Sequence, residues 1–189
     1  FIKIKVNIAE NKSIRRNSMK VLNEEQDPLN CNRTRNEGNT YYGDYNCGGW
    51  ALGTFSWFVP YRAPVERYHC LASTEVEEDL RHLLEDQFLW EDVEFLLNTF
   101  SNLTMINSLN DVSKDATVIA YRIGVFEDDY EEEWDYDFHF KVRRHGQWTE
   151  KCGGGAVKKV KEQDVFDDWI NSVEGFYYSS ELILFELKE

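Results

Sequence analysis

The sequence predicts an α+β fold in which helices come first and a mostly antiparallel sheet follows. Apolar residues recur at helical spacing between residues 74 and 100, whereas in the second half they alternate with polar residues at the period of strands. Helices followed by consecutive strands are typical of α+β domains. A chain of 189 residues is long enough to bury one sizeable core. We therefore expect a single domain, residues 1–189, with a polar lead-in at about 9–43, a helical part at about 46–101 and a sheet part at about 117–189.

The individual elements follow from the same two periods, taken in chain order. Alternating apolar and polar residues predict a strand at residues 2–8. A capping box of Thr74 and Glu77 opens a helical pattern that continues to Phe100, as one long helix or two consecutive ones. A further helix is predicted at residues 162–173. Strands are expected at residues 117–126, 134–142, 147–151 and 181–187, with the acidic run 127–133 as a solvated hairpin loop.

The charge balance limits the partners that the chain can take. The formal net charge is -14, from 35 acidic and 21 basic residues. Nucleic-acid affinity comes largely from Lys and Arg that neutralise phosphates, so we expect no nucleic-acid partner. Anionic membrane surfaces are disfavoured for the same reason. A peptide or protein substrate is expected instead, and a basic one is electrostatically favoured.

The four cysteines, Cys31, Cys47, Cys70 and Cys152, show no zinc-finger or Cys-x-x-Cys spacing. A chain of this length needs no disulfides, so we expect free thiols and a cytoplasmic location, with secretion left open as an alternative. There is no apolar run long enough for a membrane span. His69 adjoins Cys70 without further ligands at useful spacing, and the acidic run lacks EF-hand spacing. We therefore expect no metal site and no cofactor.

Cys47 stands where a polar turn gives way to an apolar stretch, in the run YNCGGWALG at residues 45–53. A thiol at a helix N-terminus lies near unpaired backbone N–H groups and the positive end of the helix dipole, and both favour the thiolate. Gly48 and Gly49 are poor helix formers, by about 1 kcal/mol each relative to Ala. Their missing side chains would let a substrate backbone approach closely. The alternative for Cys47 is a buried residue that packs as a small hydrophobic group.

His139 lies on the polar face of the predicted strand 134–142, whose other face is apolar and mostly aromatic. This placement is expected of a base that faces a cleft, and its alternative is a surface histidine among acids. Thiol catalysis needs a nucleophile, an imidazole that exchanges protons and a group that orients the imidazole. Asp137 and Asp135 share the strand face with His139, whereas Glu150 lies on the next strand and can pair across the turn. We favour Glu150 because a cross-strand neighbour points at the imidazole more naturally.

Two stretches of the chain resemble the motifs of one family. The run YYGDYNC at residues 41–47 is similar to a tyrosine and glycines that precede an Asp-Cys or Asn-Cys pair. The runs DFHFKVR at 137–143 and GQWTEKCG at 146–153 resemble the pattern D-Y-H-F-x-R followed by G-x-W-S-H-K-x-G. These motifs are typical of the papain-like, NlpC-type cysteine peptidases and amidases of bacteria and phages. The resemblance covers residues 41–58 and 117–155.

The resemblance implies a papain-like fold, in which an N-terminal catalytic helix packs on a mostly antiparallel sheet. It also implies Cys47 as nucleophile and His139 as base. Three residues depart from the pattern: Glu150 replaces its second histidine, Arg143 falls one place later than its arginine, and Cys152 replaces a residue that is often proline. The candidates for oxyanion and substrate contacts are Tyr41, Tyr42, Asn46 and Gly48.

Three functions remain open from the sequence. The first is a cysteine hydrolase that cleaves an amide bond in a peptide or peptidoglycan-like substrate, with Cys47, His139 and Glu150 as its catalytic set. The second is a disarmed papain-like scaffold that binds or inhibits a basic partner through its acidic surface, acting in the host cytoplasm if a phage encodes it. The third is a deamidase or acyltransferase with the same three residues. The substitution at Glu150 and the net charge motivate the second.

Overall fold

The computed structural model describes residues 34–36, 39–41, 45–54, 56–60, 77–128, 133–153, 155–170 and 177–188. They form a mixed α+β structure with few helices and a mostly antiparallel sheet, which confirms the predicted class. The helical elements are α1 (Cys47–Ala51), α2 (Glu77–Thr99), the 3-10 turn η2 (Leu109–Asp111) and α3 (Gln163–Phe166). The strands are β1 (Thr34–Asn36), β2 (Asn39–Tyr41), β3 (Leu103–Ile106), β4 (Thr117–Asp128), β5 (Glu133–Arg144), β6 (Gln147–Lys151), β7 (Val157–Lys159), β8 (Trp169–Ile170), β9 (Tyr177–Tyr178) and β10 (Ile183–Leu187).

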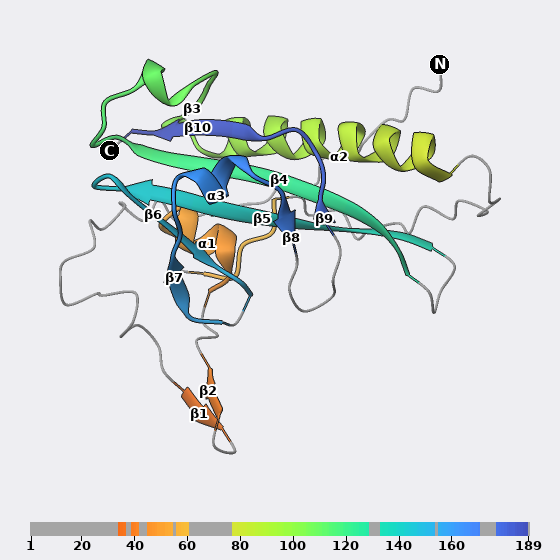
Figure 1. The fold of residues 1–189 in the computed structure, drawn as a ribbon, viewed down its shortest axis with the longest axis horizontal. Coiled ribbons are helices and arrows are strands. Elements are labelled where there is room, and N and C mark those ends of the chain that lie inside the picture. The colour runs from red at the N-terminus through yellow and green to blue at the C-terminus, as the bar shows by residue number, and fades with distance from the viewer. Residues whose placement is uncertain are drawn as a thin grey trace.

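A six-stranded sheet lies at the centre of these elements, in the order β3-β10-β4-β5-β6-β7 (Figure 1). All of its neighbouring strands pair antiparallel. The long strands β4 and β5 form its middle, and β10 lies between β3 and β4 although it comes last in the sequence. Two short hairpin pairs, β1 with β2 and β8 with β9, stand outside this sheet.

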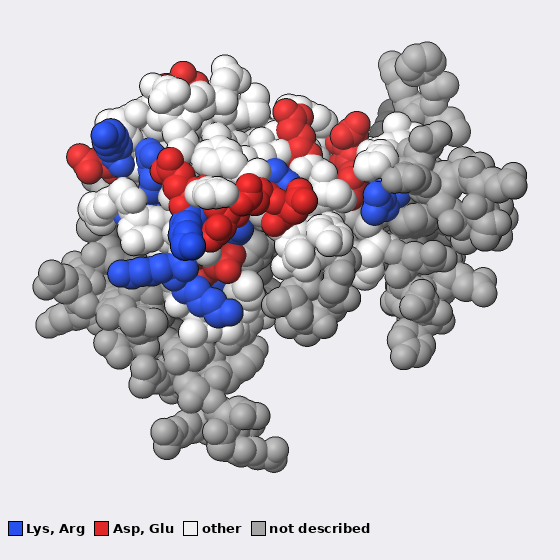
Figure 2. Space-filling model, in the orientation of Figure 1, with Lys and Arg blue, Asp and Glu red and all other residues white. Residues whose placement is uncertain are grey.

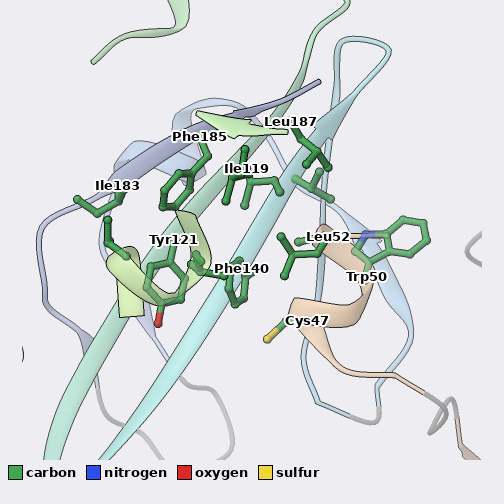
Figure 3. Close-up of a cluster of buried hydrophobic side chains, with 14 of the residues drawn as sticks. Cys47, Trp50, Leu52, Ile119, Tyr121, Phe140, Ile183, Phe185 and Leu187 are labelled. Carbon is green, nitrogen blue, oxygen red and sulfur yellow. The ribbon is translucent and has the colours of Figure 1, made fainter. Parts of the chain in front are cut away.

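The two faces of the sheet carry different layers. Successive side chains of a strand point to opposite faces. Ile119 and Tyr121 of β4 therefore pack in the same buried cluster as residues of α1 and α2, part of which Figure 3 shows. Val118 and Ala120 pack in a second cluster with residues of α3, β8 and β9. The candidate cysteine lies in the layer of α1, and its sulfur contacts the backbone of β5, the central strand that carries the candidate histidine.

The helical pattern that ends near Phe100 forms the single helix α2, of 23 residues. Its residues Leu89, Val93 and Leu96 are buried against the sheet. Thr74, the predicted N-cap, and the predicted strand at 2–8 lie outside the described residues. None of the helices in the described part of the chain is both long and apolar enough to cross a membrane.

The helix predicted at 162–173 is wrong from residue 167 to residue 170, and residues 171–173 lie outside the described part of the chain. Helix α3 ends at Phe166, Asp167 is extended, and Trp169 begins strand β8. The Trp169 indole is 2% exposed, and its Nε1 donates to the Val165 carbonyl at 3.0 Å. Burial of this large ring against the sheet outweighs the local helical preference, because tertiary packing routinely overrides propensity. The predicted final strand is shorter at its start and begins at Ile183.

A buried acid pair in the core predicts how stability depends on pH. Asp92 of α2 is 1% exposed and accepts a hydrogen bond from the Tyr121 hydroxyl. Burial raises the pKa of Asp92 from its ordinary 3.8 to about 7, against the opposing effect of the Tyr121 bond. The unfolded chain thus loses this proton near pH 3.8, whereas the folded chain holds it until about pH 7. The stability that the folded chain gains by holding the Asp92 proton is complete below pH 3.8. It is lost as the pH rises through about 7.

We expect the free energy of unfolding to fall by about 3–4 kcal/mol over this pH window relative to Asp92→Asn, since one pKa unit corresponds to about 1.4 kcal/mol. The asparagine keeps an acceptor for the Tyr121 hydroxyl but does not titrate. Urea unfolding of both proteins across the window measures the difference. Parallel stability curves for the two proteins would show that Asp92 does not titrate as described.

Candidate active site

Helix α1 has only five residues, so contacts with the rest of the chain must hold it in place. Asn46 is its N-cap, and its side-chain oxygen accepts from the Gly49 N–H at 3.1 Å. The same amide group also pairs with Phe58, donating to its carbonyl at 2.6 Å and accepting from its N–H at 3.0 Å. At the other end of α1, Arg144 of β5 donates to the last two carbonyls at 2.8 and 2.9 Å. Both ends of this helix are thus fixed to elements distant in sequence.

The glycines after the cysteine are needed for packing within the chain itself. A Cβ atom on Gly49 would lie 1.9 Å from the Ser56 carbonyl oxygen, and one on Gly48 would lie 2.8 Å from the Phe58 ring. The space expected for a substrate backbone is therefore filled by residues 56–58. Asn46 likewise serves as a cap and as a clamp on Phe58.

Cys47 is the first residue of α1 and is 4% exposed. Figure 3 shows it at the start of the helix, at the edge of the cluster that contains Tyr121 and Phe140. Its Sγ donates to the Phe138 carbonyl at 3.9 Å, a long but sulfur-typical contact. Because Phe138 directly precedes His139 in β5, this contact brings the thiol to the strand that carries the imidazole. Cys47 is a free thiol, as the sequence predicts.

His139 lies in β5 opposite Arg122 of β4, and it is 6% exposed. Two aromatic rings hold its imidazole. Tyr178 stacks on it with centroids 5.4 Å apart and an interplanar angle of 26°, and Trp169 meets it edge-on at 5.7 Å. These rings come from the β8-β9 pair, so that hairpin fixes the orientation of the imidazole.

Glu150 reaches His139 across the β5-β6 pair, as the strand argument predicts. It pairs in register with Lys141, and its Oε2 lies 3.5 Å from His139 Nε2. The contact with His139 lowers the pKa of Glu150 below its ordinary value, against the opposing effect of burial. Lys141 adds to this effect, with its Nζ 3.8 Å from the same oxygen. Glu150 is therefore an ionised partner of the imidazole.

The environment of His139 favours its charged form. Burial alone acts to lower the pKa of His139, but hydrogen bonding to Cys152, Cys47 and Glu150 raises it well above its ordinary value. The Glu150 carboxylate lies 3.5 Å from His139 Nε2, and the Cys152 sulfur lies within 4.8 Å of a ring nitrogen. A histidine that stays charged through neutral pH is suited to pair with a thiolate.

Cys152 is the neighbour of His139 that the sequence argument missed. It follows β6, is exposed, and is a free thiol. One ligand atom from each of His139, Glu150 and Cys152 lies within 4.8 Å of the other two. The register of the β5-β6 pair could have placed Cys152. Lys141 pairs with Glu150, so continuing the antiparallel pairing by two residues puts Cys152 opposite His139. The sequence-based expectation of no metal site did not consider these three residues together, because Cys152 was not placed beside His139.

The remaining sequence candidates are placed as follows. Asp137 accepts a hydrogen bond from the Tyr178 hydroxyl at 2.7 Å, so it acts on the ring that stacks on His139. Asp135 lies in β5 and Tyr41 in β2, but the side chains of both are outside the described part of the structure. Tyr42 is outside it altogether, as are Cys31, Cys70 and His69.

Comparisons with known proteins bring no relative into the argument. No protein-family model, curated protein or solved structure matches the chain. The geometry of the site therefore carries the functional argument.

Proposed function

We propose that the chain is a papain-like cysteine hydrolase that cleaves an amide bond in a peptide or peptidoglycan-like substrate. The observation that carries this proposal is the set of contacts around His139. Glu150 Oε2 lies 3.5 Å from His139 Nε2, the Cys47 Sγ contacts the carbonyl of the preceding residue Phe138 at 3.9 Å, and the Cys47 side chain contributes to the raised pKa of His139. A nucleophile, a base and an orienter are the groups that thiol catalysis uses. The resemblance of the two sequence motifs to the NlpC-type enzymes points in the same direction.

In the proposed reaction, the Cys47 thiolate attacks the substrate carbonyl carbon, and an S–C bond forms. The imidazolium of His139 gives its proton to the leaving nitrogen as the C–N bond breaks, which leaves a thioester. His139 then takes a proton from water, whose oxygen attacks the thioester and releases the acid and the thiolate. The backbone N–H of Cys47 is suited to stabilise the oxyanion, because the first N–H groups of a helix have no partner within it.

The test is the reactivity of the four thiols toward iodoacetamide near neutral pH. We expect Cys47 to be alkylated faster than Cys31, Cys70 and Cys152, as located by peptide mapping, because Cys47 is, of the two cysteines that the structure describes, the one that starts a helix beside the strand of His139. A His145→Asn variant, which replaces an exposed histidine at the β5-β6 turn, is the matched control and should leave the Cys47 rate unchanged. Equal labelling of all four cysteines, or faster labelling of Cys152 than of Cys47, would contradict the proposed nucleophile.

The burial of both reactive groups favours a second candidate, a binding protein on a disarmed scaffold. Cys47 and His139 are 4% and 6% exposed. The face drawn in Figure 2 carries acidic and basic side chains side by side over its described part, so charge alone selects no partner there. A Cys47→Ala variant that keeps the full biological effect of the chain would favour binding. Release of ammonia instead of two peptide fragments would favour a deamidase.

A further inference from the structure

We propose that His139, Glu150 and Cys152 form a zinc-binding site on the exposed side of the imidazole. Nitrogen, oxygen and thiolate sulfur are the ligand atoms that zinc takes in proteins. Among the described residues this is the group of three whose ligand atoms converge within 4.8 Å of one another. Thiolate excludes magnesium and calcium as the preferred occupants, since both select oxygen ligands.

The printed separations are close to those of a tetrahedral site. Zinc bonds of about 2.0–2.3 Å imply ligand-to-ligand edges of roughly 3.4–3.6 Å in a tetrahedron. His139 Nε2 and Glu150 Oε2 are 3.5 Å apart, which is longer than a good hydrogen bond but equal to such an edge. The contacts with Cys152 need to close by at most about 1.3 Å from the 4.8 Å limit to reach the same value.

The sheet itself brings these three residues together. Alternate residues of a strand share a face, so Glu150 of β6 and Cys152 just beyond it lie on one side. The register that pairs Lys141 with Glu150 places that side against His139 of β5. The exposed Cys152 lies after β6 and before Gly153, whose positive φ of 44° marks a turn. The strands β5 and β6 therefore hold His139 and Glu150 in place. Cys152 lies just beyond β6, next to a turn, where the backbone can adjust to an ion.

The surrounding charges set the expected affinity. The Glu150 carboxylate and a Cys152 thiolate together offset the charge of Zn²⁺. Lys141 opposes the ion, with its Nζ 3.8 Å from Glu150 Oε2, but it also donates to the Asp164 carbonyl at 2.9 Å and lies over the Trp169 ring. The fourth coordination position is left for water or an exogenous ligand, as in zinc sites that are open to solvent.

Zinc at this site would take His139 away from thiol chemistry. With zinc on one ring nitrogen and the remaining proton on the other, the ring can no longer take up a second proton, so it cannot form the imidazolium that the proposed reaction uses while the ion is bound. This consequence rests on the proposed function, whereas binding of the ion does not. The site would thus act as an inhibitory metal site next to the nucleophile.

Calorimetric titration with zinc chloride tests the site on the wild-type chain. We expect one ion per chain, and a loss of affinity of at least about 10-fold in Cys152→Ser and in Glu150→Gln, the lower bound of what even supporting groups of metal sites contribute. The matched control is His145→Asn, which removes an exposed histidine at a turn position with φ of 50° that asparagine tolerates. Cobalt substitution adds a thiolate-to-metal charge-transfer band that Cys152→Ser should abolish.

Each outcome decides a separate point. Absence of zinc binding to the wild type, or unchanged binding in Cys152→Ser, overturns the site even if Cys47 is selectively alkylated. Loss of binding in Cys47→Ser with retention in Cys152→Ser overturns it as well, because the ion then sits elsewhere. Zinc binding as expected, without slower iodoacetamide labelling of Cys47, overturns the inhibitory consequence. Restoration of labelling by a chelator supports both parts.

Discussion

Replacement of His139 by glutamine is expected to slow alkylation of Cys47 by iodoacetamide about 100-fold or more near neutral pH, in line with the contribution of a positioned acid–base group. Glutamine keeps hydrogen-bonding capacity and similar length but cannot carry the charge that stabilises a thiolate. The imidazole is the group that Cys47, Cys152 and Glu150 share, so its loss removes the centre of the site.

The pH dependence gives this prediction a second measurement. Because the pKa of His139 is raised, its charge should persist through neutral pH and disappear only as the pH rises past that value. The difference between wild type and His139→Gln should therefore be largest below that pH and shrink above it. Stopped-flow or mass-spectrometric rates across the pH range measure this, with His145→Asn as the control. Equal rates for Cys47 in both proteins at every pH would remove His139 from the proposed mechanism.

Replacement of Gly49 by alanine is expected to destabilise the fold by about 3 kcal/mol or more, a large effect for a single methyl group. Its Cβ would lie 1.9 Å from the Ser56 carbonyl oxygen and 3.0 Å from the Tyr45 side chain, and the first of these is backbone. Alanine raises helix propensity by about 1 kcal/mol, so the clash acts against a local gain. The segment 56–58 must move, and the Asn46 clamp on Phe58 breaks with it.

Gly48→Ala is the matched comparison in the same helix. Its Cβ would meet the Phe58 ring at 2.8 Å, and a ring edge gives way more readily than a carbonyl. We expect a cost of about 1 kcal/mol or less, because the helical gain offsets part of the contact. Denaturant unfolding of the three proteins at one pH measures both effects. If the two alanines cost the same, segment 56–58 does not restrict α1 as described.

The sequence predicted those parts of the site that depend on neighbouring strands. The tight turn at His145 and Gly146 joins β5 to β6, so strand period and turn position were enough to bring Glu150 toward His139. Strand β6 itself matches the predicted residues 147–151. The same arithmetic would have placed Cys152 opposite His139, had the pairing been extended past the strand end.

The parts that depend on distant contacts were not predictable in the same way. Trp169 and Tyr178 approach His139 only because β8 leaves the helical path and pairs with β9. The hydrogen bonds between Asn46 and Phe58 join a helix cap to a segment with no periodic pattern. Local helix and strand propensities predict neither arrangement, because each results from the packing of side chains against elements far away in sequence.

The place of β10 in the sheet has a consequence for biosynthesis. Strand β3 pairs with β10, and β10 pairs with β4, so the sheet has a gap between β3 and β4 until residues 183–187 have been made. The aromatic rings that hold His139 also come late, at Trp169 and Tyr178. A nascent chain that has passed Cys47 and His139 on the ribosome therefore carries both candidate residues without the strands β8, β9 and β10. The two aromatic rings that orient His139 are therefore in place only after residues 169–178 have been made.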